Sequence, residues 1–239
     1  MSNKMLLFIL LLVSACVVST TQTTTPPYWF GSINQFTPKF SAQLAFNCID
    51  KVPTTYILNP YTGVKVRMYT FPFHHIVAVD ADIQLEDIAH THCNVTLPAG
   101  CVGHIYDYLF KTVQASLDLY LMYNIHPIIF VGHSVGGTLA QYMAYHVLQQ
   151  QGKVQRVETF GSPPVGNRSF NDWVCMHTQC IRHHNVNDPV PHLSSPVFQY
   201  HERIQVDIGS TDTVEQLQVY KQDLMHSFDH AKYYGFKRC

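Results

Sequence analysis

The sequence has few charged residues and no excess of basic ones. Charged side chains make up 13% of the 239 residues, about half of the roughly 25% found in an average globular protein. Together with 46% hydrophobic residues, this excludes a long disordered chain. Fifteen Lys and Arg residues against sixteen Asp and Glu residues leave no basic surplus to bind nucleic acid. The sequence also lacks internal repeats, a low-complexity linker and an apolar run of the ~20 residues that a membrane span needs.

The first residues have the organisation of a secretory signal peptide. Lys4 is the only charged residue before residue 20, and an unbroken apolar run from Met5 to Val13 follows it. Small residues come next, and this order is typical of a leader that is removed on export. The apolar run is too short for a transmembrane span, so an N-terminal anchor is the weaker interpretation. We therefore expect residues 1–19 to be a signal peptide and residues 20–239 to form one secreted (extracellular) domain.

Six cysteines remain once such a leader is removed, an even number that favours disulfides in an exported protein. Close spacing along the chain favours two local pairs, and the remaining pair would tie the two ends of the domain together. The expected pairs are Cys93–Cys101, Cys175–Cys180 and Cys48–Cys239. Two Asn-x-Ser/Thr triplets, at Asn94 and Asn167, are candidate glycosylation sites in the same compartment.

Apolar segments of two kinds predict an α/β domain. Continuous apolar or β-branched stretches predict strands, and apolar residues at intervals of three or four predict helices. The expected strands are 64–69, 76–79, 128–131, 154–160 and 181–184, and the expected helices are 105–123 and 136–151. Because strands alternate with helices, we expect a mostly parallel sheet that is covered by helices on both faces.

A short motif lies between one expected strand and the helix that follows it. Gly132-His133-Ser134-Val135-Gly136 fits the pattern Gly-x-Ser-x-Gly, in the strand-to-helix context that the pattern requires. The glycines allow a sharp turn that raises the serine out of the sheet, and the helix N-terminus favours developing negative charge. A glycine-rich turn that merely contains a serine is the alternative. The context favours Ser134 as a nucleophile.

A serine nucleophile needs a histidine base and a carboxylate that orients this base, here in the chain order serine, acid, histidine. Asp188 is well placed as the acid, because it follows an expected strand and its loop is stiffened by Pro189 and Pro191. Spacing alone does not decide between the last two histidines that follow it. The candidate bases are His192, His201, His226 and His230.

Four ordered motifs resemble those of the class 3 lipases, a family of secreted fungal triacylglycerol lipases. The likeness looks closest to the nematode and other invertebrate members. The motifs are the serine turn and its helix at 132–140, and the segments 159–167, 188–193 and 229–236.

This resemblance implies the α/β-hydrolase fold and a set of catalytic residues. Ser134 corresponds to the nucleophile, Asp188 to the orienting acid and His230 to the general base, so the last motif selects His230 over the other histidines. Members of the family often join the two ends of the domain by a disulfide, which supports the pair Cys48–Cys239.

The resemblance fails in the loop after the expected strand 76–79. The family has Arg-Gly-Thr or Arg-Gly-Ser there, and its hydroxyl residue supplies one oxyanion-hole donor, whereas this chain has Asp80-Ala81-Asp82. We expect Val135 and Asp82 to form the oxyanion hole through backbone N–H groups. The hydroxyl donor of the family is missing here, and loss of one oxyanion donor typically lowers turnover about 10²–10³-fold. In addition, a carboxylate at this position repels an oxyanion. The alternative to an active enzyme is therefore a weak or inactive lipase-like protein that binds lipid or another partner.

Residues 83–92 follow that loop, at the place where fungal relatives carry a lid. Ile83, Leu85 and Ile88 stand among acidic residues, so the segment either covers the site and turns toward lipid or packs on the core as a surface helix. The segment 90–93 contains two histidines and a cysteine, but no second ligand group has the spacing of a metal site.

The motifs thus predict a secreted lipase or carboxylic ester hydrolase that acts on acylglycerols through an acyl-enzyme. We expect a lipid ester as its partner, at a lipid–water interface, and neither a cofactor nor a metal. Two rival interpretations are a catalytically silent lipid-binding protein and a soluble esterase without interfacial activation.

Overall fold

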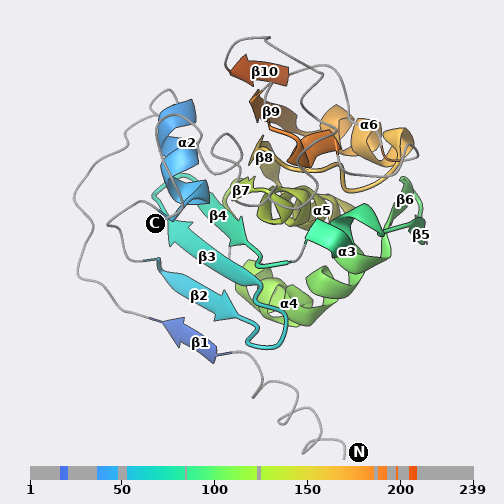
Figure 1. The fold of residues 1–239 in the computed structure, drawn as a ribbon. Coiled ribbons are helices and arrows are strands. Elements are labelled where there is room, and N and C mark those ends of the chain that lie inside the picture. The colour runs from blue at the N-terminus through green and yellow to red at the C-terminus, as the bar shows by residue number, and fades with distance from the viewer. Residues whose placement is uncertain are drawn as a thin grey trace, which may run out of the picture.

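The fold is built on one mixed sheet with helices on both faces (Figure 1). The computed structural model describes residues 17–20, 37–47, 53–83, 85–122, 125–185, 188–192, 198 and 205–208. Within these residues the sheet has eight strands in the order β1-β2-β3-β4-β7-β8-β9-β10, and β5 and β6 form a separate hairpin. The first three pairings are antiparallel, and all pairings from β4 to β10 are parallel. The expected mostly parallel sheet is therefore confirmed.

The elements follow one another along the chain as in Figure 1. The strands are β1 (Val17–Thr20), β2 (Thr55–Leu58), β3 (Lys65–Thr70), β4 (His75–Asp80), β5 (Cys93–Leu97), β6 (Gly100–Gly103), β7 (Ile128–His133), β8 (Val154–Phe160), β9 (Gln179–Asn185) and β10 (Gln205–Ile208). The helices are α2 (Pro38–Ala45), α3 (Leu85–Ala89), α4 (His104–Met122), α5 (Val135–Gln149) and α6 (Arg168–His177), with a 3-10 turn η2 (Val190–His192). Every strand and helix expected from the sequence is present within two residues of its expected bounds.

Two helices that apolar periodicity did not reveal are defined by their caps. α2 begins with a proline in its first turn, and the Oγ1 of Thr37 accepts a hydrogen bond from the Phe40 N–H at 3.3 Å. α6 begins in the same way, because Asn167 Oδ1 accepts a hydrogen bond from the Phe170 N–H at 3.1 Å. Side chains of this kind satisfy N–H groups that lack a partner inside the helix, and they fix where a short helix starts.

The strand side chains alternate between two cores. In β7, Ile128 and Phe130 belong to the larger apolar cluster, on the side of α4, α5 and α6. Ile129 and Val131 point the other way, into a smaller cluster that includes Leu44 of α2. This alternation is the consequence of the two-residue period of a strand that is covered on both faces.

Two of the three expected disulfides are present. Cys93–Cys101 closes the β5–β6 hairpin, and Cys175–Cys180 links the end of α6 to the start of β9. Cys48 and Cys239 lie outside the described residues, so their pairing stays a prediction.

The N-terminal strand overlaps the expected leader. β1 begins at Val17, and cleavage between Cys16 and Thr20 would shorten or remove it and leave β2 at the edge of the sheet. None of the helices in the described part of the chain is long and apolar enough to cross the membrane.

Candidate active site

Ser134 occupies a strained turn between β7 and α5. Its backbone has φ 55° and ψ −132°, and a positive φ is uncommon for a residue that carries a side chain. The turn is fixed to the neighbouring strand, because the Ser134 N–H donates to the Phe160 carbonyl at the end of β8, with an N···O distance of 2.9 Å. The expected strand–serine–helix geometry is therefore present, and it places Ser134 at the carboxyl end of β7.

Two glycines of the motif permit this turn to pack closely. A Cβ on Gly132 would overlap the backbone of Gly136, and a Cβ on Gly136 would overlap the carbonyl of Val79 in β4. The close approach of Gly132 to Gly136 lies within the turn. The close approach of Gly136 to Val79 packs the start of α5 against the neighbouring strand β4. Both positions need glycine for close approach rather than for an unusual φ.

Asp188 lies in the loop after β9 and is 1% exposed. Its backbone N–H donates to the Asn185 carbonyl at 2.8 Å, and its Oδ1 accepts from the Val190 N–H at 3.0 Å. Both bonds are local, so they hold the carboxylate at the carboxyl end of β9.

The nucleophile and the acid stand at the same edge of the sheet. Ser134 follows β7 and Asp188 follows β9, and β8 runs parallel between these strands. Backbone bonds join the three ends, since Ser134 is bonded to Phe160 and the Gly161 N–H donates to the His183 carbonyl at 3.0 Å. Loops after parallel strands gather functional groups at this edge. His201, His226 and His230 lie outside the described residues, so the base stays a prediction.

The expected oxyanion loop leaves β4 beside the start of α5. Val135 is the first residue of α5 and is 2% exposed, and the N–H groups of a first helical turn have no partner within the helix. Asp82 is exposed, and its Cβ lies beside Gly63 in the turn between β2 and β3. Asp80 is 4.0 Å from the Lys65 ammonium on the adjacent strand β3. The loop after β4 thus lies beside the start of α5 and carries two carboxylates, and its part in an oxyanion hole stays a prediction.

The candidate lid segment packs on the core in this structure. α3 has five residues. Ile88 is fully buried and Ile83 is 8% exposed, and both belong to the apolar cluster beneath α4 and α5. The contacts match the surface-helix interpretation of residues 83–92.

The two candidate glycosylation sites differ in their surroundings. Asn94 is exposed on the β5–β6 hairpin. Asn167 is partly buried, and its Oδ1 also accepts a hydrogen bond from the Cys101 N–H at 3.2 Å in addition to capping α6. The amide of Asn167 therefore already fastens the disulfide-closed hairpin to α6.

A buried polar cluster that the sequence patterns did not single out lies under the serine turn. Glu158 of β8 is fully buried, and His183 of β9 is 1% exposed. The carboxylate Oε1 lies 2.7 Å from His183 Nε2, and Oε2 accepts a hydrogen bond from Ser41 Oγ at 2.7 Å. Arg156 Nη1 is 3.6 Å from Oε2. A glutamate inside the apolar strand 154–160 was the one signal in the sequence that could have revealed this cluster.

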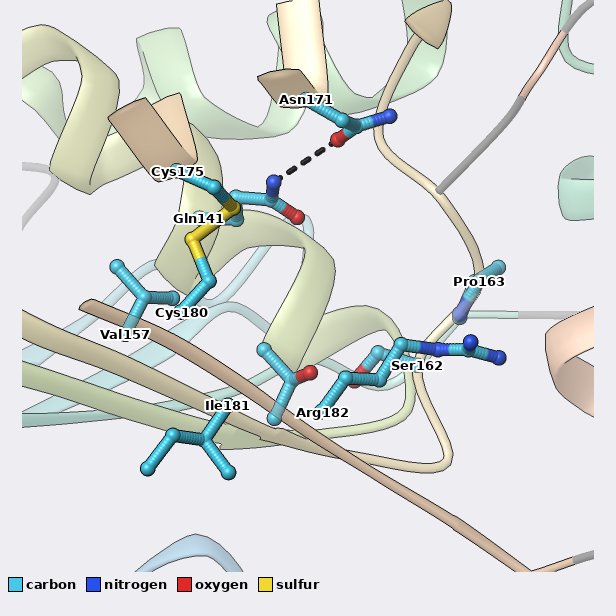
Figure 2. A pocket seen from close by; sticks show the side chains of 10 residues that line it. Gln141, Val157, Ser162, Pro163, Asn171, Cys175, Cys180, Ile181 and Arg182 are labelled. Atoms are coloured by element: carbon cyan, nitrogen blue, oxygen red, sulfur yellow. Dashed lines mark hydrogen bonds between the residues drawn. A yellow bond between two sulfur atoms is a disulfide. The ribbon is translucent and has the colours of Figure 1, made fainter. Parts of the chain in front are cut away.

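A pocket lies between α5, α6, β8 and β9 and has an empty volume of about 460 Å³, its open mouth included. In Figure 2 the Cys175–Cys180 disulfide stands at one side of it, and Ser162 and Arg182 stand at the other. Neither Ser134 nor Asp188 lines this pocket, so it is separate from the candidate catalytic groups. Among the described residues, no group of three His, Cys, Asp or Glu side chains is arranged to hold a metal ion.

Comparison with known proteins agrees with this geometry. The lipase (class 3) family matches residues 61–198, which is more than half of the chain. A secreted mono- and diacylglycerol lipase of Fusarium solani is 38% identical over 73 residues, which are 30% of this chain and 22% of that protein. The chain therefore spans about a fifth of the length of this curated relative.

Solved lipase structures share the fold. A lipase from Rhizopus microsporus var. chinensis superposes with a TM-score of 0.55 at 16% identity, covering 77% of this chain and 74% of that one. A triacylglycerol lipase described as having a serine protease triad as its catalytic centre gives 0.57 at 19% identity, covering 74% and 77%. The fold is that of the α/β-hydrolases, and the chain belongs to the class 3 lipase family.

Proposed function

We propose that this protein is a secreted lipase that hydrolyses acylglycerol esters through Ser134, Asp188 and His230. The strained backbone of Ser134, at the junction of β7 and α5, is the observation that carries the proposal. Asp188 supports it as a buried acid at the same edge of the sheet. The disulfides Cys93–Cys101 and Cys175–Cys180 support export, because such bonds persist in oxidising compartments.

The proposed reaction proceeds in two steps. His230 takes the proton of Ser134 as the serine oxygen attacks the ester carbonyl, and the resulting tetrahedral oxyanion expels the alcohol, which receives that proton from His230. Water then gives a proton to His230 and attacks the acyl-serine, and the fatty acid leaves as Ser134 regains its hydrogen. Asp188 keeps the imidazole in the correct orientation and stabilises its charged form. Backbone N–H groups of Val135 and Asp82 would receive the oxyanion.

Labelling and hydrolysis together test the nucleophile. We expect a fluorophosphonate probe to label the wild type and a short p-nitrophenyl ester to be cleaved, and Ser134→Ala to lose both. Ser116→Ala on α4 is the matched control and should keep both. Labelling that persists in Ser134→Ala would assign the reactive serine elsewhere.

Paired histidine variants test the base. His230→Ala should abolish ester cleavage and leave the thermal unfolding midpoint unchanged, whereas His226→Ala should keep near wild-type turnover. The reverse pattern would show that the C-terminal motif is assigned to the wrong histidine.

The acidic oxyanion loop favours a second candidate function, a lipase-like protein that binds lipid without turning it over. If the Asp82 carboxylate opposes catalysis, Asp82→Thr should raise turnover at neutral pH, by up to the ~10²-fold that one oxyanion donor supplies. Vesicle binding by a wild type that neither labels nor hydrolyses would support the silent lipid-binding protein instead.

The burial of Ile83 and Ile88 raises the question of interfacial activation. A lid that turns toward lipid must withdraw such side chains from the core, whereas a fixed surface helix need not. Rates measured below and above the micellisation of one substrate distinguish the two. A jump at micellisation supports a mobile segment 83–92, and a continuous curve supports a soluble esterase.

A further inference from the structure

Two histidines bracket the loop that carries Asp188. His184 lies in β9 and is 6% exposed, and His192 ends η2 at the far side of the loop. Their Nε2 atoms are 3.1 Å apart, and the rings stand nearly perpendicular, at 76°, with centroids 5.0 Å apart. This contact joins the two ends of the segment that presents the acid.

Three hydrogen bonds within the described part of the loop are short-range. The Asp188 N–H donates to Asn185, the Val190 N–H to Asp188, and the His192 N–H to the Pro189 carbonyl at 3.0 Å. Each of these links residues two or three positions apart. The contact between the two imidazoles ties the end of η2 back to β9 across eight positions.

An imidazole–imidazole hydrogen bond depends on protonation in a specific way. One Nε2 must carry a hydrogen and the other must offer a lone pair. The bond therefore forms between two neutral rings or between one neutral and one charged ring, and it is lost when both rings are charged. Two like charges at this separation also repel each other.

The charged surroundings resist the second proton. His192 is exposed at the surface, but desolvation by its neighbours still lowers its pKa. The Arg182 cation lowers this pKa further, and the Asp188 carboxylate opposes the shift. Arg182 stands two positions before His184 on β9, and Asp188 lies in the bracketed loop, so both strand and loop contribute a charged group that acts on His192. The bonded form is therefore the stable one at neutral pH.

We propose that His184 and His192 form a latch that positions the Asp188 loop and opens when both rings are protonated. This inference rests on the proposed function, because Asp188 must act as the orienting acid for the latch to affect turnover. In this view the two histidines are positioning residues. The latch adds an acid limit to activity beyond the protonation of the general base.

Kinetics of three variants test the latch. His192→Leu removes the bond, and we expect kcat at neutral pH to fall about five- to tenfold with KM nearly unchanged, as for loss of one hydrogen bond. His192→Gln can bond to His184 without acquiring charge, so it should restore most of this loss. His177→Gln, at the exposed end of α6, is the matched control and should behave as the wild type.

The pH profile separates the latch from the base. Every variant keeps His230, so the ratio of kcat in His192→Gln to kcat in the wild type cancels the titration of the base. This ratio should rise as the pH falls below the ordinary imidazole range, where the second ring of the wild type takes up its proton. A ratio that stays constant with pH would overturn the latch.

An NMR titration that does not depend on turnover distinguishes failure of the latch from failure of the proposed function. In Ser134→Ala, nitrogen-15 NMR of the side chains should show His184 and His192 titrating as a coupled pair, and His192→Gln should change the titration of His184. If the two histidines titrate as a coupled pair but the wild-type protein shows no esterase activity, the latch is retained and the proposed enzyme is refuted. If the wild type is active but the two histidines titrate independently, the latch is refuted.

Discussion

The two faces of the sheet bury different kinds of side chain. On the side of α4, α5 and α6, the strands bury a large continuous apolar cluster. On the side of α2, the apolar cluster is smaller, and the buried residues around it include Arg67, Glu158 and His183. The apolar face is stabilised by the burial of apolar surface, whereas the stability of the α2 face also requires that its buried polar groups keep their partners.

This difference teaches where each face is vulnerable. An apolar core loses stability in proportion to the cavity that a substitution leaves. A buried polar cluster loses most when one member is removed and the others stay buried without it. The α2 face also lies directly under the serine turn, because Phe46 after α2 packs against the ring of His133 with centroids 4.2 Å apart.

The largest effect is expected from a matched pair of leucines. Leu139 of α5 and Leu44 of α2 are both fully buried. Leu139→Ala should lower the free energy of unfolding by about 4–5 kcal/mol, because the strands around it cannot move into the cavity. Leu44→Ala should lower it by about 2–3 kcal/mol, because a short helix can shift and fill part of the cavity. Urea denaturation measures both, and equal losses would remove the distinction between the faces.

Removing the buried carboxylate should come next. Glu158→Ala leaves His183 buried without its partner and removes the carboxylate beside the partly exposed Arg156, and it should cost about 3–4 kcal/mol in urea denaturation. The double variant Glu158→Leu/His183→Leu replaces the pair with apolar side chains and should recover much of that loss. A double variant as unstable as the single one would mean that the pair itself stabilises the fold.

The apolar face also buries His75, next to α4, and the charge of this histidine should set a pH dependence. Burial lowers the pKa of His75 to about 4, with His126 and His74 adding to the shift, and its Nδ1 lies 3.1 Å from the Tyr120 hydroxyl. The unfolded chain protonates this ring near pH 6.5, so stability is complete above that value and falls between pH 6.5 and about 4. The difference between 6.5 and about 4 corresponds to about 3 kcal/mol.

Comparison with a variant that does not titrate isolates this effect. His75→Gln can keep a bond to Tyr120, so the wild type should lose stability relative to it as the pH falls through that window. A difference that does not change with pH would show that folding does not lower the pKa of His75.

The smallest expected effect concerns a single hydroxyl on the α2 face. Ser41→Ala removes a hydrogen bond to the Glu158 carboxylate and should cost about 1.5–3 kcal/mol, the range for bonds to charged groups. Ser116→Ala on α4 should change stability by less than about 0.5 kcal/mol, as is usual for surface positions. Equal effects would show that the hydroxyl at position 41 adds nothing to the buried cluster.

The sequence by itself determined the features that depend on neighbouring residues. The turn at Ser134, the alternation of strands and helices and the two local disulfides all follow from side chains that are close in the chain, so periodicity and spacing revealed them. The place of Asp188 after a strand could be predicted for the same reason, since a strand end and two prolines define its loop, and its role as the acid stays a prediction.

Only the tertiary structure decided which polar groups meet across the sheet. Ser41, Glu158 and His183 lie in α2, β8 and β9, and their contact requires the helix to be placed on one face and the strands to be paired in one register. The contact between His184 and His192 likewise depends on the path of a loop. Long-range contacts of this kind leave no periodic signal, because their partners are selected by packing rather than by spacing along the chain.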